Sequence, residues 1–473
     1  MAELDIPTRR TIEGKNQGKA RREALPRKSL GTLGNRHPDF DPVKALEDQA
    51  GPRVPELVPL RYDRMAVSPF AFLRGAAAVM AYDLAMTPST GIDVQLCGDA
   101  HLSNFGVFAS PERRLIFDVN DFDETLPGPF EWDVKRLAAS AAVALSGLGF
   151  EEPVVAKVLR RCAGAYRETI RELAGLGTLD VWYRRLDIES SITDLRAMFT
   201  DDKGQQVDDI VARARRKDSR QAFTKMVGMI DGSFRFIPDP PIVVPVDDLA
   251  LVTELGRTRD DVLNEAMDEY ARSLSADRQH LLGTYERVDL ARKVVGVGSV
   301  GTRCFVMLLI GRGFDDPLIL QIKEALPSVL ESHLGPTHAR TAGQRVIEGQ
   351  RMMQAATDIF LGEFRLNYSA DETHDFYVRQ FHDAKASVDF TTVDSADNAA
   401  SYLEICAYTL ARAHARSGNR AALNAYIGAS DAFDKAITNW ALAYKDRNDA
   451  DYAAFMAARE SGRLPTLGPD APV

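Results

Sequence analysis

The sequence has little cysteine, no long apolar run and no excess of basic residues. Its four cysteines, at positions 97, 162, 304 and 406, lie far apart and form no Cys-x-x-Cys pair. This spacing excludes a zinc ribbon or a disulfide framework and fits a reducing cytoplasm. No apolar run approaches the ~20 residues that a transmembrane helix needs. The formal net charge of −10 argues against nonspecific affinity for nucleic acid.

What the sequence does have is the composition of a folded globular protein, with 45% hydrophobic, 27% charged and 8% aromatic residues. A chain of 473 residues is too long for one simple core, so two or three lobes are expected. Residues 1–30 are rich in basic residues but contain no apolar segment, and they are not predicted to be a secretory signal. We predict a disordered basic arm there, solvated or loosely docked.

The distribution of helical and strand-like patterns predicts an α+β fold. Residues 31–150 contain two short strands that each lead into polar and acidic residues. Residues 151–285 are predicted to be a helical insertion with a proline-rich hairpin at FRFIPDPPIVVPV. Residues 286–385 are predicted to form a small β-rich lobe, and residues 386–473 the C-terminal helices of a larger helical lobe.

The segment CGDAHLSNFG places Asp99 and Asn104 five residues apart on one loop. Enzymes that transfer a phosphoryl group from ATP use this arrangement. An aspartate accepts or orients the proton of the attacking hydroxyl, and an asparagine on the same loop holds a metal ion. A second acid after a following strand then bridges metal and phosphates, and Asp121 in NDFDE has that position. The same acids could instead cap helices, and His101 could be a metal ligand, a base, or a histidine bonded to a backbone carbonyl.

A glycine-rich loop follows much later, where Gly296, Gly298 and Gly301 form a G-x-G-x-x-G pattern that includes Ser299. A dinucleotide-binding motif would need a helix directly after the third glycine. The residues that follow, TRCFVMLLIG, are instead typical of a strand. A strand, a glycine loop and a second strand form the arrangement that covers the phosphates of ATP in kinases, so we predict a nucleotide-binding loop.

The next strand, LILQIKEA, carries Lys323 between apolar residues. A buried ammonium group needs an anionic partner. We predict that Glu348, on the following helix, pairs with Lys323 and orients it toward the α and β phosphates. Glu324 should point to the opposite face of the strand. An exposed lysine on an edge strand, surrounded by surface glutamates, is the alternative.

Taken together, CGDAHLSNFG and IFDVNDFDETLPGPFEWDVKRLA resemble the aminoglycoside phosphotransferase branch of the protein-kinase-like fold. The resemblance implies that Asp99 is the catalytic base and that Asn104 and Asp121 are metal ligands. It also implies that Asp133, on the next helix, braces the loop. This sequence has Cys97 where the related family usually has histidine. The whole chain resembles members of the bacterial family called domain of unknown function 2252.

The order of these motifs is reversed relative to ordinary kinases, in which the glycine loop and lysine precede the catalytic loop. The segment HDFYVRQF suits the strand that leads to the hinge, and EICAYTLARAHARSG resembles the helix before the catalytic loop. We therefore predict a two-lobed kinase-like fold that is circularly permuted and has helical insertions. In that fold Lys323, Asp99 and Asp121 face one cleft.

The function predicted from these motifs is a cytoplasmic phosphotransferase that uses ATP and two Mg²⁺ ions. Its acceptor, a small molecule or a protein, is not specified by the sequence, and transfer of AMP by the same motifs stays open. A metal-dependent hydrolase is the first alternative, with His101, Asp99, Asp121 and Asp123 all on one metal ion. A module that binds nucleotide without catalysis is the second alternative.

Overall fold

The computed structural model describes most of the chain. The described residues are 8–188, 212, 215, 219–246, 259–294, 296, 298–313, 315–367, 372–381, 390, 393 and 395–467. Helices and strands are both abundant in these ranges, which confirms the α+β prediction. Parts of the predicted arm and of the predicted insertion, residues 1–7, 189–211 and 247–258, lie outside the described residues. Within the described residues, no helix combines the length and the apolar character needed to cross a membrane.

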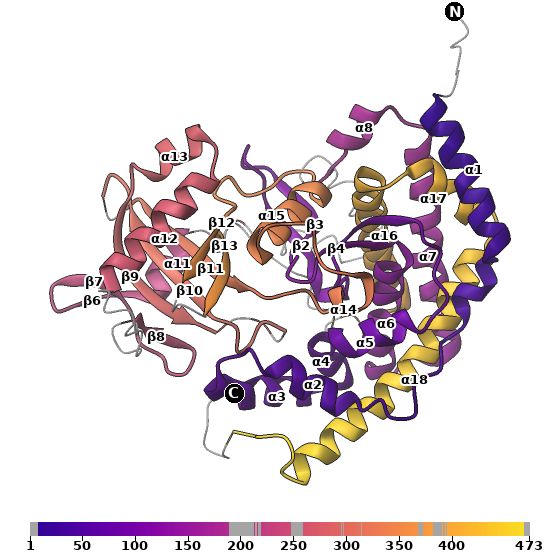
Figure 1. The fold of residues 1–473 in the computed structure, drawn as a ribbon, viewed down its shortest axis with the longest axis horizontal. Coiled ribbons are helices and arrows are strands. Elements are labelled where there is room, and N and C mark those ends of the chain that lie inside the picture. The colour runs from indigo at the N-terminus through magenta and orange to yellow at the C-terminus, as the bar shows by residue number, and fades with distance from the viewer. Residues whose placement is uncertain are drawn as a thin grey trace, which may run out of the picture.

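One side of the molecule is a six-stranded antiparallel sheet (Figure 1). Its strands, in spatial order, are β12 (Gly362–Asn367), β13 (Thr373–Gln380), β11 (Pro317–Ala325), β10 (Cys304–Ile310), β9 (Glu286–Lys293) and β8 (Val243–Pro245). The predicted β-rich lobe supplies five of these strands, and the proline-rich segment adds β8 at an edge. Proline is tolerated at an edge because the missing N–H costs no ladder hydrogen bond.

The two faces of this sheet differ in character, because side chains alternate along a strand. Leu320 and Ile322 of β11 pack on the face that is covered by α12 (Arg259–Ser273). Gln321 and Lys323 point to the other face, and Lys323 stands opposite Cys304 of β10 and Tyr377 of β13. The second helix after β11, α15 (Ala342–Met353), packs against β12 and β13.

The other side of the molecule is a helical body around α6 (Glu131–Gly147). It also contains α7 (Glu152–Ala174), α16 (Ala396–Ser417), α17 (Arg420–Ile427) and α18 (Ala432–Glu460). The small side chains of AASAA in α6 allow close helix packing, and nearly the whole helix is buried. Because α7 packs against α16 and α18 in the main core, it belongs to the helical body rather than to an insertion.

Short strands flank the loops of Asp99 and Asp121 at the edge of the helical body. They are β1 (Asp93–Leu96) paired with β4 (Leu126–Pro129), and β2 (Phe105–Ala109) paired with β3 (Leu115–Val119), which also pairs with β5 (Leu186–Asp187). The sequence SPFAFLRGAAAVMAYDLAMTP suggests one helix, but the chain forms α4 (Pro69–Gly75) and α5 (Ala77–Ala85). The break follows Gly75, whose carbonyl accepts a hydrogen bond from Arg61 instead of continuing the helix.

The remaining elements are short helices and strands that belong to the helical body, to the sheet or to the segments between them. They are η1 (Arg27–Gly31), α2 (Pro42–Ala50), η2 (Pro55–Leu57), α3 (Val58–Ala66), η3 (Leu102–Asn104), α8 (Thr178–Tyr183), α11 (Ser219–Met226), β6 (Val227–Ile230), β7 (Ser233–Phe236), α13 (Ala276–Leu282) and α14 (Glu331–Leu334).

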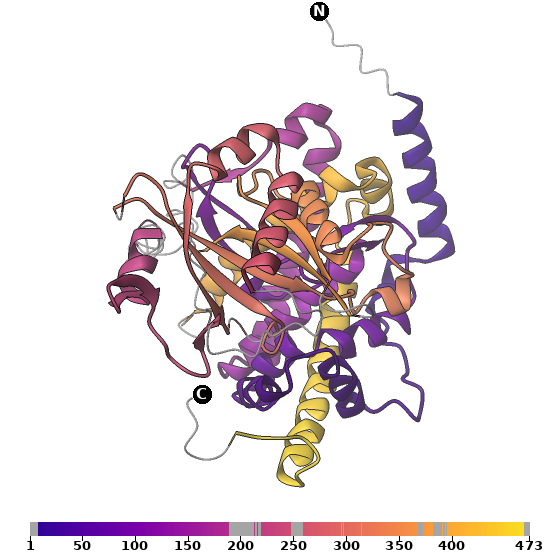
Figure 2. The ribbon, with the colours of Figure 1, turned by 60° about the vertical axis from the view of Figure 1, so that its left-hand side comes forward.

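The N-terminal segment is a docked helix, so the prediction of a disordered arm is wrong for residues 8–30. Helix α1 (Arg9–Ala24) packs against α17 on the outside of the helical body (Figures 1 and 2). Its contact face is made by Gly14 and Gly18; a Cβ atom at Gly18 would lie 2.2 Å from the Ala422 carbonyl oxygen. The prediction failed because α1 has no apolar stripe, and backbone approach through glycine takes its place.

Candidate functional site

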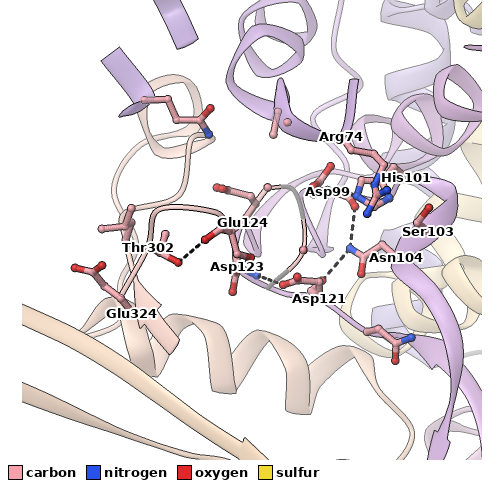
Figure 3. A pocket seen from close by; sticks show the side chains of 18 of the residues that line it. Arg74, Asp99, His101, Ser103, Asn104, Asp121, Asp123, Glu124, Thr302 and Glu324 are labelled. Atoms are coloured by element: carbon pink, nitrogen blue, oxygen red, sulfur yellow. Dashed lines mark hydrogen bonds and ion pairs between the residues drawn. The ribbon is translucent and has the colours of Figure 1, made fainter. Parts of the chain in front are cut away.

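A polar cavity of about 220 Å³ lies between the helical body and the sheet (Figure 3). Most of the predicted site residues line it, namely Asp99, His101, Asn104, Asp121, Asp123, Gly296, Gly298 and Ser299. A second cavity of about 340 Å³, mostly apolar, lies on the α12 face of the sheet. It lies away from the predicted motifs, because Lys323 and Asp121 are on the opposite face. The polar cavity is therefore the candidate site.

The loop from Cys97 to Asn104 is held from below by the start of α6. The Asp133 carboxylate accepts hydrogen bonds from the backbone N–H groups of Cys97 at 2.8 Å and Gly98 at 3.0 Å. His414 of α16 contacts the same carboxylate at 3.2 Å, so an imidazole from another segment lies beside the loop where Cys97 departs from the related pattern. Gly98 has φ +82°, and a Cβ there would lie 2.2 Å from the Glu124 carbonyl oxygen. Asp133 thus has the bracing position that was predicted for it.

Asp99 points into the cavity as an ion pair with Arg136. The Arg136 Nε and Nη2 atoms lie 2.8 and 2.7 Å from Asp99 Oδ1. Burial alone would raise the pKa of Asp99, but Arg136 and His101 outweigh it and hold the pKa below its usual value. Sequence reasoning missed Arg136. Its spacing of three from Asp133 on one helix was the available signal, because both then face the same loop.

His101 lies beside Asp99 but is not held as a strong ion pair. Its Nε2 atom is 3.5 Å from Asp99 Oδ2, and its Nδ1 atom is buried without a hydrogen-bond partner. Burial lowers the pKa of His101 to about 4, against the opposing effect of Asp99. His101 is therefore neutral at pH 7, with one ring nitrogen buried and without a protein partner.

Asn104 connects the two acidic loops. Its Nδ2 donates to the carbonyl oxygens of Asp99 at 2.8 Å and Asp121 at 3.1 Å. This fixes the amide orientation, and its Oδ1 atom is left buried without a partner. The Oδ1 atom of neighbouring Asn120 is also buried and unpartnered. Buried polar atoms are rarely left unsatisfied in folded proteins, so these two oxygens mark a place for a ligand.

Lys323 reaches the acidic loop from the sheet. Its Nζ atom lies 2.6 Å from Asp123 Oδ2 and 3.7 Å from Asp121 Oδ2. Tyr377 donates to the other oxygen of Asp123 at 2.6 Å. Burial would raise the pKa of Asp123, but Lys323 outweighs it and lowers that pKa to about 2. The pKa of Asp121 is raised, by burial first and by the Asp123 charge second. Lys323 thus pairs closely with Asp123 and more distantly with Asp121.

The predicted pairing of Lys323 with Glu348 is wrong. Glu348 is exposed on the outer face of α15, where its carboxylate accepts from Gln344. The buried side of this helix presents Arg345, which donates to the carbonyl oxygens of Asp123, Thr125 and Leu326. Because the buried side of α15 carries a second cation, this helix provides no glutamate to pair with Lys323. Asp123 pairs with Lys323 instead. The surface-lysine alternative also fails, because Lys323 is only 2% exposed.

The glycine loop closes the cavity from the sheet side. Ser299 Oγ lies 3.2 Å from Asp123 Oδ2, and the Arg64 side chain donates to the Gly296 carbonyl. Gly296 and Gly301 have φ values of +66° and +89°, which favour glycine. Gly301 lies outside the cavity lining, and its carbonyl accepts from the Val54 backbone N–H at 2.7 Å. The loop is therefore anchored by segments that precede α4 in the chain.

The cage of the hydrolase alternative is not formed. All four of its residues are described, yet nowhere in the described ranges do three or more His, Cys, Asp or Glu side chains group so as to hold a metal ion. Asp99 is occupied by Arg136, and Asp123 by Lys323 and Tyr377. The Oδ1 atoms of Asn104 and Asn120 have no partner, and Asp121 is held less tightly, by the Asp123 N–H at 3.2 Å and by Lys323 at 3.7 Å.

Comparison with known proteins gives one match. The profile of a bacterial family, described as "Uncharacterized protein conserved in bacteria (DUF2252)", matches residues 53–458. No curated protein and no solved structure matches the chain. The matched range includes the loop of Asp99, the acidic loop, the glycine loop and Lys323, so the whole candidate site lies within it. The chain therefore belongs to the bacterial DUF2252 family, as its sequence indicated.

Proposed function

We propose that this protein is an ATP- and Mg²⁺-dependent phosphotransferase with a circularly permuted kinase-like fold. One observation carries the proposal: the two acidic loops and the glycine loop, which comes much later in the chain, line one cavity. Asp99 and Asp121 line the cavity, and Lys323 contacts the acidic loop across 200 positions of sequence. Accidental matches to three separate motifs would have no reason to lie together. The buried, unpaired cysteines fit a cytoplasmic location.

The order of elements in the sheet supports the same proposal. The glycine loop joins β9 to β10, Lys323 lies on the third strand β11, and α15 follows. Protein kinases place the phosphate-covering loop, the lysine and the next helix in this order. The catalytic loop then comes from the N-terminal half, as a permuted chain requires.

The open oxygen atoms fit a Mg²⁺ ion. Mg²⁺ prefers oxygen ligands and is commonly held by one or two carboxylates together with substrate phosphates. Asn104 Oδ1 and the Asp121 carboxylate would hold it, since the first is buried without a partner and the second has a raised pKa that a cation would lower. The ion would neutralise charge on the phosphates during transfer.

The remaining chemistry falls to Asp99. An acceptor hydroxyl hydrogen-bonded to its carboxylate attacks the γ-phosphorus of ATP, a new P–O bond forms, and the bond to the β-phosphate oxygen breaks to release ADP. Asp99 orients the hydroxyl and takes its proton as the new bond forms. Arg136 fixes the carboxylate in place for this role and keeps it ionised.

Replacement of Asp99 tests the proposal. Asp99→Asn should bind Mg·ATP as the wild type does but should lose about 10²–10⁴-fold of the transfer rate, measured as ATP hydrolysis with water as acceptor. Asp93→Asn, an exposed change on the same segment, should leave that rate unchanged. Label on the γ- or the α-phosphate distinguishes phosphoryl transfer from AMP transfer. If neither ATP, ADP nor GTP raises the melting temperature of the wild type, with or without Mg²⁺, the proposal is wrong.

A further inference from the structure

The wall of the cavity next to Asp99 carries a cation that makes no hydrogen bond or ion pair with the described residues. Arg74, in the last turn of α4, lines the cavity together with Asp99, His101 and Ser103 (Figure 3). No other described residue makes a hydrogen bond or ion pair with the Arg74 side chain, its Nε atom is buried, and its guanidinium lies 6.0 Å from the centroid of the Phe70 ring. Burial lowers the pKa of Arg74 and the Asp99 charge opposes this, but Asp99 already receives two contacts from Arg136. Two guanidinium groups thus face one carboxylate.

The position of Arg74 is set by rigid neighbours. Ser68 caps the start of α4, with its hydroxyl accepting from the Ala71 N–H at 3.1 Å. The helix ends at Gly75, whose carbonyl is bound by the buried Arg61. The glycine loop lies against the backbone of Arg74, with the Arg74 carbonyl oxygen 3.6 Å from where a Cβ of Gly298 would be. Arg74 therefore lies between the glycine loop, which is proposed to cover the phosphates, and Asp99, the proposed base.

Arg74 is half-buried, and its Nε atom is shielded from solvent without a hydrogen-bond partner, an arrangement that proteins tolerate where a ligand completes it. The ring of His101, with its open Nδ1 atom, and the hydroxyl of Ser103 line the same wall. The Asp121 carboxylate proposed for Mg²⁺ lies on the other side of Asn104 from His101 and Ser103 (Figure 3). The cavity is thus divided into a side that favours cations and a side that favours anions.

We infer that Arg74, His101 and Ser103 form an anion subsite that receives a phosphate or carboxylate group beside Asp99. The inference rests on the proposed function in one respect, since it assigns that group to the reacting partners. The group is either the terminal phosphate of the nucleotide or an anionic substituent of the acceptor. In the second case the acceptor is a hydroxy acid or a phosphate ester, and a polycationic acceptor of the aminoglycoside kind is disfavoured by Arg74 and Arg136.

Titration calorimetry on Arg74→Gln tests this subsite and separates the two sources. The probes are inorganic phosphate with saturating Mg·ADP, Mg·ADP alone, and a non-hydrolysable ATP analogue with Mg²⁺. If the subsite receives the terminal phosphate, the variant binds the analogue about 10-fold or more weakly and ADP unchanged. If it receives the acceptor, both nucleotides bind unchanged and phosphate binds about 10-fold or more weakly.

Two further variants control the experiment. Arg74→Lys retains the charge and should restore most of the binding, whereas Arg312→Gln, on an exposed turn of the sheet, should change nothing. The free Arg74→Gln protein should melt at nearly the same temperature as wild type, because the lost guanidinium is half-buried and makes no hydrogen bond or ion pair with the described residues. A lower melting temperature with unchanged affinity for all probes would assign Arg74 a structural role and overturn the inference. If wild type binds no nucleotide, the proposed function fails, and titration with phosphate alone still decides the subsite.

Discussion

The two walls of the cavity satisfy their polar atoms in different ways. On the wall built from residues 74–124, four buried atoms lack partners: Arg74 Nε, His101 Nδ1, Asn104 Oδ1 and Asn120 Oδ1. On the wall built from residues 296–379, none of the described lining residues has such an atom. Lys323, just behind that wall, is paired with Asp123. We call the first wall incomplete because it holds buried polar atoms without protein partners, and the second complete because its described lining residues hold none.

This difference suggests a division of labour between the walls. Open donors and acceptors in a buried place are what a binding site needs, because they lose their solvent without gaining protein partners. A wall with saturated contacts instead keeps its shape and holds its own charges in position. A nucleotide that reaches Lys323 must therefore share it with Asp123, whereas a ligand at Asn104 or His101 displaces no protein partner.

The largest effect is expected from removal of the cation behind the complete wall. Lys323→Met leaves Asp121 and Asp123 without it and should lower the free energy of unfolding by about 3–5 kcal/mol. Glu348→Ala, on the exposed face of α15, should change it by less than about 0.5 kcal/mol. Chemical denaturation measures both. Equal effects of the two changes would mean that Glu348, and not the acidic loop, holds the lysine.

An intermediate effect is expected from His101 on the incomplete wall. Its pKa of about 4 lies below the ordinary value of 6.5, so its contribution to stability is full above pH 6.5 and is lost as the pH falls toward 4. The free energy of unfolding of wild type minus that of His101→Gln should fall by about 3 kcal/mol over this window. Denaturation of both proteins at several pH values measures it. A difference that does not change with pH would show that His101 is solvated or paired.

The smallest of the three effects is expected from the brace beneath the incomplete wall. Asp133→Asn keeps one acceptor for the loop but loses the charge and the second acceptor, so it should cost about 1.5–3 kcal/mol. Hydrogen exchange at the amides of Cys97 and Gly98 should accelerate, whereas exchange in the sheet should not change. The loop would be independent of the brace if both amides kept their protection. Asp93→Asn is the matched control.

Much of the first wall could be predicted because its groups are close in sequence. Asp99 and Asn104 share one loop, Asp121 follows the end of β3, and Asp133 lies in the first turn of α6, so short-range spacing places them near one another. Asp133 therefore lies where the motif placed it. His414, which lies beside the same loop, comes from a helix almost at the other end of the chain. No local pattern could assign it to the loop.

Partner choice on the second wall could not be predicted. The rule that a buried lysine needs an anion is correct, and Lys323 has two. Glu348 was the wrong choice, because the rotation of α15 about its axis is set by packing against β12 and β13. That rotation directs Arg345 inward and Glu348 to solvent. The docking of helix α1 could not be predicted for a similar reason, because it depends on close backbone approach to α17 at Gly14 and Gly18.

The sequence by itself determined the kinds of element, the composition of the two acidic loops and the glycine loop, and membership of the DUF2252 family. These follow from short-range pattern and spacing. Only the tertiary structure decided that these loops share one cavity, that Asp123 rather than Glu348 holds Lys323, and that Arg74 lines the cavity with Asp99 but makes no hydrogen bond or ion pair with the described residues. The physical reason is that charge pairing depends on distance in space, and packing of distant segments sets that distance.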